Sequence, residues 1–329
     1  MKLSEAQKYK ELISAHKGTE ISNEELQKAM IAEGGILSNL YQELEMDSKA
    51  VDCHDDVNYT KDKVQLHSHT FYEILYCRSG NVQYLLGADR YRVGRGDIVF
   101  VPPGISHRPL YLDQLVEPYS RHVIWIHPDF IKTLTENLGF TPLSKPVLLR
   151  TKDSGWEYLA QYFQSACMEA ATKQEGFQAC MMSDAVQLLI HLTRACNHSK
   201  AMEPLMEKKE LLDELIAYIE NHLAEKITLK SAAGSFYISE RAISRLFSEK
   251  MDVSFYRYVT QRRLIAAKVL IINGEPLETI GEQVGFSDYS TFYRAFKQAF
   301  SISPKQFKKL QKENSKNTPP AARSQQARY

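Results

Sequence analysis

The chain has 329 residues, 43% of them hydrophobic, and a formal net charge of +1. This length allows two or three domains with hydrophobic cores, and the composition is that of a globular protein. The sequence contains no apolar run that approaches a membrane span, and its charged start is unlike a signal peptide. Five scattered cysteines without a C-x-x-C pair argue against a disulfide framework or a zinc finger. We therefore expect a reduced cytoplasmic protein without a membrane partner.

The near-neutral charge conceals an uneven distribution along the chain. Residues 1–207 carry 21 Lys and Arg against 27 Asp and Glu, whereas residues 208–310 carry 16 against 12 and residues 311–329 carry 4 against 1. The basic excess therefore lies toward the C-terminus, where a phosphate backbone would require it. The excess is modest, so charge by itself does not establish a nucleic-acid partner.

The first half of the chain changes pattern near residue 57. Residues 1–56 predict a helical arm, with a packing or oligomerisation role as the default interpretation. From residue 57 to about 150, short apolar and aromatic runs alternate with Gly, Pro, Asn and Asp turns. Many short strands with regular turns predict a sandwich or a barrel.

Three histidines and a glutamate form a possible site within this strand-rich region. His67, His69 and Glu73 share one face if residues 64–73 form a continuous strand, and His107 follows the turn at residues 102–104. Imidazoles and a carboxylate bind first-row metals when they converge. These four residues are thus candidate ligands of a small molecule or of a divalent transition metal. The alternative is that the histidines only form hydrogen bonds inside the barrel mouth.

Two motifs in this region resemble the cupin family. They are His67-x-His69-x3-Glu73-x6-Gly80 and Gly96-x5-Pro102-x-Gly104-x2-His107, with Tyr111 where an asparagine is usual. The resemblance implies a jelly-roll-like β-barrel, with or without a metal ion, because fold and motif do not fix chemistry.

Helices are expected after the barrel. A helix at residues 129–139 should end at Gly139, and residues 151–198 show helical spacing in two segments. The two segments could form a dimer seam or a lid over the barrel, and the sequence leaves both open. Residues 199–208 lack any period and are expected to be a linker.

The C-terminal region contains the same unit twice. Residues 228–247 and 277–297 each predict a short helix, a tight turn and a second helix with a polar face. Residues 255–272 predict a connecting helix about 27 Å long. A strut of that length could place two reading helices about one DNA turn (~34 Å) apart. The repeat weakens the alternative of an ordinary helical hairpin.

Residues 210–310 resemble the AraC/XylS family of bacterial transcription regulators. The matching positions are Arg263-Leu264-x-x-Ala267-Lys268-x-Leu270, Ile280-x3-Val284-Gly285-Phe286-Ser287-Asp288-x-Ser290-x-Phe292-x-Arg294-x-Phe296-Lys297 and Phe300-x-x-Ser303-Pro304-x-x-Phe307. The departures include Gly281 for alanine, Tyr237 at a turn glycine, Asp252 and Ser301 where glycines are usual, and Phe307-Lys308 for Tyr-Arg. These departures affect local stability more than function.

The resemblance implies which side chains contact DNA: Arg241, Ser244 and Arg245 in the first unit, and Tyr289, Ser290, Thr291 and Arg294 in the second. Arginine can bind guanine bidentately, with about 1–3 kcal/mol of discrimination. The alternative for Arg245 and Arg294 is a solvated or phosphate-bound side chain, because phosphate contacts outnumber base contacts.

We thus expect an α+β chain: a cupin β-barrel with a helical extension, followed by an all-α domain with two helix-turn-helix motifs. The function expected is a cytoplasmic, DNA-binding transcription regulator, an activator in preference to a repressor. Its barrel would sense a small molecule, such as a sugar or related metabolite. A homodimer and, for an activator, RNA polymerase are the expected partners. The alternatives are a metal-dependent cupin enzyme with a helical accessory domain and an architectural DNA-binding protein.

The expected segments are an arm (1–56), the sensor barrel (57–150), a helical dimerisation or lid segment (151–198), a linker (199–208), the DNA-binding domain (209–310) and a disordered basic tail (311–329).

Overall fold

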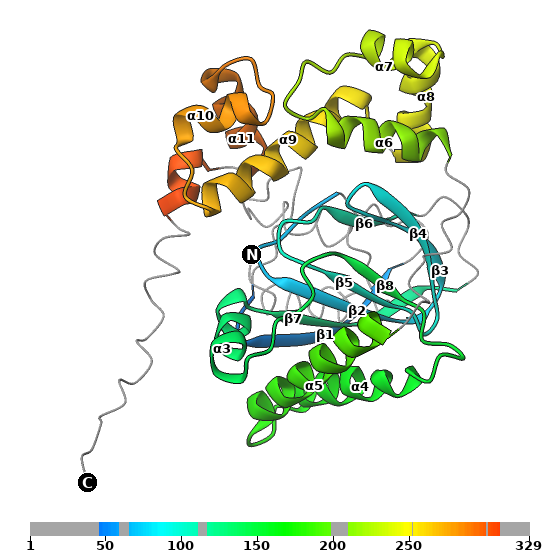
Figure 1. Cartoon of the computed structure of the whole chain (residues 1–329), viewed down its shortest axis with the longest axis vertical. Helices are drawn as coiled ribbons and strands as arrows, with labels where there is room; N and C mark the ends of the chain where they lie inside the picture. The colour runs from blue at the N-terminus through cyan, green and yellow to red at the C-terminus, as the bar shows by residue number, and fades with distance from the viewer. Residues whose placement is uncertain are drawn as a thin grey trace, which may run out of the picture.

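The computed structural model describes residues 46–58, 66–110, 117–198, 210–251, 253–300 and 302–309. It shows two facing β-sheets with a helical hairpin on one side and the C-terminal helices on the other (Figure 1). The expected linker and tail lie outside the described residues, as do the expected arm up to residue 45 and the positions Tyr111, Asp252 and Ser301. Among the described residues, no helix is both long enough and apolar enough to span a membrane.

The larger sheet has five antiparallel strands in the order β1-β7-β2-β5-β8. Side chains alternate between its two faces, as the period of a strand requires. One face packs against helices, and the other faces the smaller sheet. The strands are β1 (Val51–Asn58), β2 (Tyr72–Ser79), β5 (Ile98–Val101), β7 (Tyr119–Ile126) and β8 (Val147–Leu149).

The smaller sheet has the order β4-β3-β6, formed by β3 (Asn81–Leu86), β4 (Asp89–Gly94) and β6 (His107–Leu110). The β3–β4 hairpin turns at Gly87, whose φ of 66° lies in the left-handed region. Val82, Tyr84 and Leu86 point from β3 into a core shared with Val123 and Trp125 of β7. The β-rich domain expected from the sequence is therefore present, as two facing sheets.

Two expectations about the first strands were wrong. Strand β1 begins at Val51, so residues 51–56 belong to the sheet and not to a helical arm. The acidic side chains concealed this strand: Asp52 accepts hydrogen bonds from the preceding turn, and Asp55 pairs with His122. Residues 66–71 do not form the continuous strand expected through His67 and His69, and instead make one isolated bridge, from His67 to His107.

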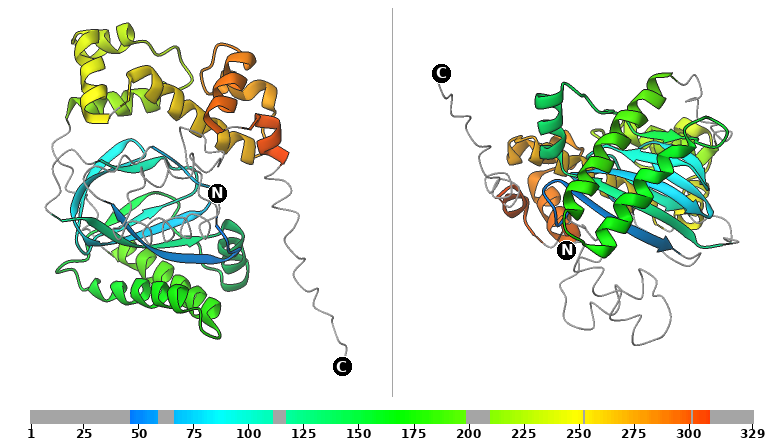
Figure 2. Two further views of the ribbon diagram at one scale, coloured as in Figure 1. Left: turned by 180° about the vertical axis from the view of Figure 1, so that it is seen from behind. Right: turned by 90° about the horizontal axis from the view of Figure 1, so that it is seen from below.

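Three helices cover the sensor sheets. Helix α3 (Pro128–Leu138) ends at Gly139, whose φ is 63°, as the sequence predicts. Helices α4 (Ala160–Thr172) and α5 (Phe177–His198) form a hairpin across the outer face of the larger sheet (Figure 2). Leu159, Phe163 and Leu188 of this segment are fully buried against that face. The hairpin thus covers the outside of the sheet rather than the space between the sheets.

The described part of the C-terminal region contains helices α6 to α11 and a short helical segment at residues 304–309. Helix α9 (Phe255–Ile272) is the connecting helix, and its two ends match the sequence prediction. A helix pair lies at each end of it (Figure 1). The first helix pair is α7 (Leu229–Phe236) with α8 (Glu240–Met251), the second is α10 (Leu277–Gln283) with α11 (Tyr289–Phe300), and α6 (Leu211–Asn221) precedes both.

Candidate DNA-reading faces and sensor core

The first helix pair presents a polar face on α8. Ile243 and Phe247 are completely buried, four residues apart, and this spacing turns the opposite side of the helix outward. Arg241 and Arg245 are exposed, whereas Ser244 is half-buried. Arg245 Nε lies 3.9 Å from Oε1 of Glu249, an exposed i,i+4 pair that is weak in water. The two arginines are therefore available to a ligand.

The turn of the first helix pair is formed by Tyr237. Its φ of 55° lies in the left-handed region, and its side chain is 96% exposed. The backbone thus adopts the conformation usual for a turn glycine although the residue is a tyrosine. An exposed aromatic ring at this position contributes no core packing within the described chain.

The second helix pair has the same arrangement of buried and exposed side chains, and Asp288 caps the start of its second helix. Phe292 and Phe296 are buried, while Tyr289, Ser290 and Arg294 are exposed. Arg294 Nε donates weakly to Ser290 O, at 3.4 Å. The face of α11 away from its core therefore carries the side chains that the sequence analysis assigned to DNA.

Thr291 differs from its neighbours because its polar atoms are engaged. Its backbone N–H donates to Asp288 Oδ1 at 2.7 Å, and its hydroxyl donates to Oδ2 at 2.9 Å. This is an N-cap, which satisfies a free helix donor. The same contacts, together with the Ser287 hydroxyl, hold the pKa of Asp288 below its usual value. Thr291 thus orders the start of α11, and the sequence analysis did not foresee this role.

Two arginines of α9 hold this connecting helix to neighbouring segments of the C-terminal region. Arg262 forms an ion pair with Glu220 of α6 through both carboxylate oxygens. Arg263 donates to Leu223 O at 3.0 Å and to Glu225 O at 2.6 Å, and its guanidinium lies over the ring of Phe286. Arg263 therefore links the loop before the first helix pair to the turn of the second.

The sensor core contains a convergent cluster of His69, Glu73 and His107. Their ligand atoms all lie within 4.8 Å of one another, and all three side chains are nearly or fully buried. Glu73 points inward because it is the cross-strand partner of Trp125, whose indole N–H donates to Glu73 Oε1 at 2.8 Å. The ring of His67 lies 4.3 Å from that of His107, but His67 is not one of the three converging residues.

With both histidine rings in the Nδ1–H form, their Nε2 lone pairs face the Glu73 carboxylate, and this arrangement favours a bound proton or cation. His69 Nδ1 lies 2.7 Å from Phe71 O, and His107 Nδ1 lies 3.0 Å from Ile105 O. A carbonyl only accepts, so each Nδ1 holds the proton and each neutral ring presents an Nε2 lone pair. Both Nε2 atoms face Glu73 Oε2, at 3.5 and 2.9 Å, without hydrogen-bond geometry. A ring proton or a divalent cation would satisfy all three groups.

The pKa shifts of His69 and Glu73 result from two opposing effects, burial and neighbouring charge. Burial lowers the pKa of His69, although Glu73 opposes this effect. Burial would raise the pKa of Glu73, but the adjacent imidazoles of His107 and His69 hold it well below its usual value. Glu73 is therefore a buried carboxylate, which is costly unless it is paired. The donor set fits a metal ion held by His69, Glu73 and His107, with His Nδ1–H groups fixed by carbonyls.

Helix α6 lies along the outer face of the smaller sheet, and α7 lies farther from that sheet (Figure 1). The C-terminal end of α8 also reaches the sheet, at Arg108. Leu66, Leu85 and Leu110 of the sensor belong to the same core as α6, α7 and α8. Gly104, in the loop before β6, packs closely against Val269 of α9. The sensor and the C-terminal helices therefore share an apolar interface.

Two buried arginines complete that interface. Arg90 of β4 donates from Nε to Asp213 Oδ1 at 2.8 Å and from Nη2 to Oδ2 at 3.0 Å. It also pairs with Glu210 at 3.1 Å. Arg108 of β6 donates to Met251 O at 2.9 Å, at the C-terminal end of α8, where a cation is favoured. Sequence reasoning missed these contacts, because the paired residues are 120 or more positions apart in the chain and no local motif marks them.

Two family models match the chain. The model of the AraC-like ligand binding domain matches residues 51–215, and a helix-turn-helix domain model matches residues 232–310. The first covers half of the chain and begins at the first residue of β1. The chain belongs to the AraC family of transcription regulators.

Relatives in the AraC family have similar sequences. The HTH-type transcriptional activator RhaS of Enterobacter sp. (strain 638) is 26% identical over 249 residues, which cover 74% of this chain and 86% of that protein. RhaS of Salmonella typhimurium is 25% identical over 244 residues, 73% and 85% of the two chains. These relatives are activators and not enzymes. The alternative of a metal-dependent cupin enzyme is therefore set aside, and the chain is a DNA-binding regulator with a ligand-binding domain.

Solved structures also resemble this AraC-family chain. ToxT from Vibrio cholerae O395 is 14% identical, covering 80% of this chain and 98% of that chain, with a TM-score of 0.33. The C-terminal domain of AraT, a response regulator from Geobacillus stearothermophilus, is 29% identical, covering 30% and 82%, with a TM-score of 0.29. These TM-scores are too low to carry a structural argument, and the family assignment rests on the sequence models.

Proposed function

We propose that this chain is a ligand-responsive transcriptional activator with two DNA-reading helix-turn-helix units, α7–α8 and α10–α11. The observation that carries the proposal is the arrangement of the C-terminal helices. The polar faces of α8 and α11 are exposed at the two ends of α9, while the first helix pair shares a core with the sensor. The names of the curated relatives support activation over repression.

The DNA contacts proposed are base contacts by both reading helices. Arg241, Ser244 and Arg245 would serve on α8, and Tyr289, Ser290 and Arg294 on α11. Helix α9 has 18 residues, a length of about 27 Å, so the two helices can reach major-groove segments about one turn apart. Thr291 has a lesser share in base contact, because its hydroxyl donates to Asp288.

The effector site proposed is the polar cluster inside the sensor. His69, Glu73 and His107, with His67 beside them, offer donors and acceptors among Phe71, Trp125 and Tyr84. Apolar walls with a few polar groups are typical of small-molecule sites, and hydroxyl groups of a sugar or related metabolite match these partners. The closed jelly-roll barrel of the cupin family is part of this proposal.

A divalent transition metal is a second possible occupant, favoured by the two Nε2 lone pairs that face Glu73. It would be held by His69, Glu73 and His107 and would polarise a bound hydroxyl or carboxylate. Elemental analysis of the purified chain tests this. A near-stoichiometric ion is expected if the site is metallated, and an ion-free protein with a full effector response would contradict it.

The signal is proposed to pass through the interface at Arg90 and Arg108. An effector shifts the equilibrium only if it binds one arrangement of the two domains better than another. Such a shift would change how α6 and α8 sit on the smaller sheet, and therefore how the first reading helix meets DNA. Homodimerisation through α4–α5 would raise affinity by effective concentration, and an activator would also contact RNA polymerase.

The experiment is promoter binding and in vitro transcription by the full chain, with and without sugars and related metabolites. An effector is expected to change DNA affinity and transcription, and the Glu73→Gln variant is expected to lose that change while still binding DNA. Effector responses identical in the wild type and in all sensor-cluster variants would contradict the sensor role.

A further inference from the structure

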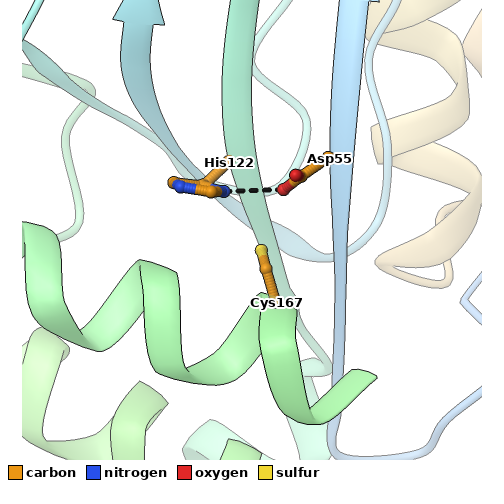
Figure 3. A group of neighbouring side chains, drawn as sticks. All are labelled: Asp55, His122 and Cys167. Carbon is orange, nitrogen blue, oxygen red and sulfur yellow. Dashed lines mark hydrogen bonds and ion pairs between the residues drawn. The ribbon is translucent and has the colours of Figure 1, made fainter. Parts of the chain in front are cut away.

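A second group of metal-binding side chains lies outside the sensor core, on the helix-covered face of the larger sheet. It consists of Asp55 of β1, His122 of β7 and Cys167 of α4 (Figure 3). One ligand atom from each residue lies within 4.8 Å of the other two. The three side chains come from three segments that the fold brings together, so no local sequence motif marks them.

The sheet register places the first two residues. Asp55 and His122 are direct cross-strand partners, and their neighbours Cys53 and Ile124 on the same face are packed under the helices. His122 Nδ1 lies 2.6 Å from Asp55 Oδ1. The ring of His122 stacks on that of Tyr76, the next residue across the sheet. The imidazole is therefore held with Nδ1 toward Asp55.

Helix α4 supplies the third residue. Cys167 lies on the buried side of α4, beside Phe163 and Ala166, and its thiol points into the space between His122 and Asp55 (Figure 3). A nucleophilic triad would instead place the thiol against the imidazole nitrogen remote from the carboxylate. Burial, followed by the charge of Asp55, raises the pKa of Cys167, which also argues against a reactive thiolate.

We propose that Asp55, His122 and Cys167 form a binding site for a thiophilic divalent transition-metal ion of the zinc class. Thiolate, imidazole and carboxylate are the ligands that such ions prefer, and three protein ligands leave one position of a tetrahedron open. The site is accessible from solvent, because the side chain of Asp55 is 49% exposed. Asp55 Oδ2 can retain Arg78, whose Nη1 lies 3.1 Å away, while Oδ1 binds the ion.

A metal ion at this site would join α4 to β1 and β7 by coordinate bonds. Binding displaces the thiol proton of Cys167 and replaces the hydrogen bond between His122 and Asp55. Because only the folded chain brings the three ligands together, the ion stabilises the packing of the α4–α5 hairpin on the sheet. This role is independent of DNA reading and of the effector site.

Cobalt titration of the full chain tests the proposal, because a thiolate–cobalt charge-transfer band reports a cysteine ligand directly. The sensor cluster contains no cysteine, so cobalt bound there cannot give this band. We expect the band to saturate at about one ion per chain. Cys167→Ser should abolish it, whereas Cys180→Ser, at an exposed position on α5, should leave it unchanged.

Two further measurements keep the outcome decisive. Zinc should raise the Tm of the wild type and of Cys180→Ser but not of Cys167→Ser. If Cys167→Ser does not fold, Asp55→Asn changes the half-exposed ligand with little effect on packing and should weaken cobalt binding at least tenfold. The proposal is overturned if the wild type gives no thiolate–cobalt band or if the band survives in Cys167→Ser. It is also overturned if Asp55→Asn binds cobalt as tightly as the wild type.

Discussion

The two helix pairs have the same plan but different surroundings. The first helix pair shares its core with Leu66, Leu85 and Leu110 of the sensor, and Arg108 binds the end of α8. The core of the second helix pair consists, among the described residues, of C-terminal side chains such as Phe292, Phe296 and Phe307. Helix α8 is thus attached to the sensor, and α11 is attached through α9.

This difference suggests how a repeated unit can serve two purposes. A change in the sensor reaches α6 directly through Arg90 and the end of α8 directly through Arg108. It reaches α11 only through the stiff α9 and the Arg263 contacts to Leu223 and Glu225. The first helix pair would then report the effector, and the second would provide constant DNA affinity. Variants that affect one pair and not the other test this division.

Gly285→Ala should give the largest effect, at the contact between the turn of the second helix pair and the loop that follows α6. Gly285 has a φ of 90°, and an added Cβ would lie 2.2 Å from Leu223 O and 2.8 Å from Arg263 Nη2. Strain and overlap with backbone should cost more than about 3 kcal/mol of unfolding free energy.

Its control lies in the first helix pair. Gly234 of α7 has no atom within 4 Å of an added Cβ, so Gly234→Ala should stabilise the helix by up to about 1 kcal/mol. Chemical denaturation measures both variants. Equal stabilities for the two would show that the turn of the second helix pair is not held as described.

Arg90→Ala should release α6, which precedes the first helix pair, from the sensor. The Arg90 side chain is 3% exposed and Asp213 is 11% exposed, so the variant leaves an uncompensated carboxylate in the interface. Removing one partner of a buried ion pair costs up to about 3–5 kcal/mol of stability. This cost is reduced by the hydration free energy that Asp213 regains when the domains separate. Amide hydrogen exchange should increase in α6 and on β3.

Arg92→Ala is the matched control on the same strand, because Arg92 contacts Asn81 within the smaller sheet. It should leave exchange in α6 unchanged. The division between the two helix pairs fails if Arg90→Ala increases exchange in α11 as much as in α6.

Arg294→Ala should relax preference at one or two base positions by about 1–3 kcal/mol each. Arg245→Ala should do the same at different positions, in the half-site read by α8. Lys297→Ala, at an exposed position in the last turn of α11, should weaken all sequences alike. Competition binding with single-base operator variants measures these effects. Uniform weakening by Arg294→Ala would make Arg294 a phosphate contact.

The smallest expected effect is a pH dependence of sensor stability. The pKa of His69 is lowered in the fold, so the unfolded chain takes up the proton first, and stability falls as the pH drops below about 6.5. Glu73 adds a further loss below about pH 4.5, because its folded pKa is also depressed. His69→Gln should flatten the first slope in urea unfolding between pH 5 and 7. An unchanged dependence of stability on pH would mean that His69 is not buried in its neutral form.

Local sequence patterns predict the C-terminal helices well, but they do not reveal contacts between residues that are far apart in the chain. Both ends of α9 follow from the helical spacing of residues 255–272, and the structure adds that Ser254 caps the start of the helix. Strand β1 was missed because its carboxylates find partners on other segments. The sequence placed four residues in one site, and the structure brings His69, Glu73 and His107 together without His67. They meet through the isolated His67–His107 bridge and the bend before β2, not through the continuous strand that was expected.

Selection of DNA from a random pool by the full-length chain tests the central claim most directly. Two reading helices at the ends of α9 predict two half-sites about 10–10.5 base pairs apart, centre to centre. Arg245→Ala should erase information in one half-site and Arg294→Ala in the other. A single uninterrupted motif affected by both variants, or no enriched sequence, would contradict the claim that both helix pairs read DNA.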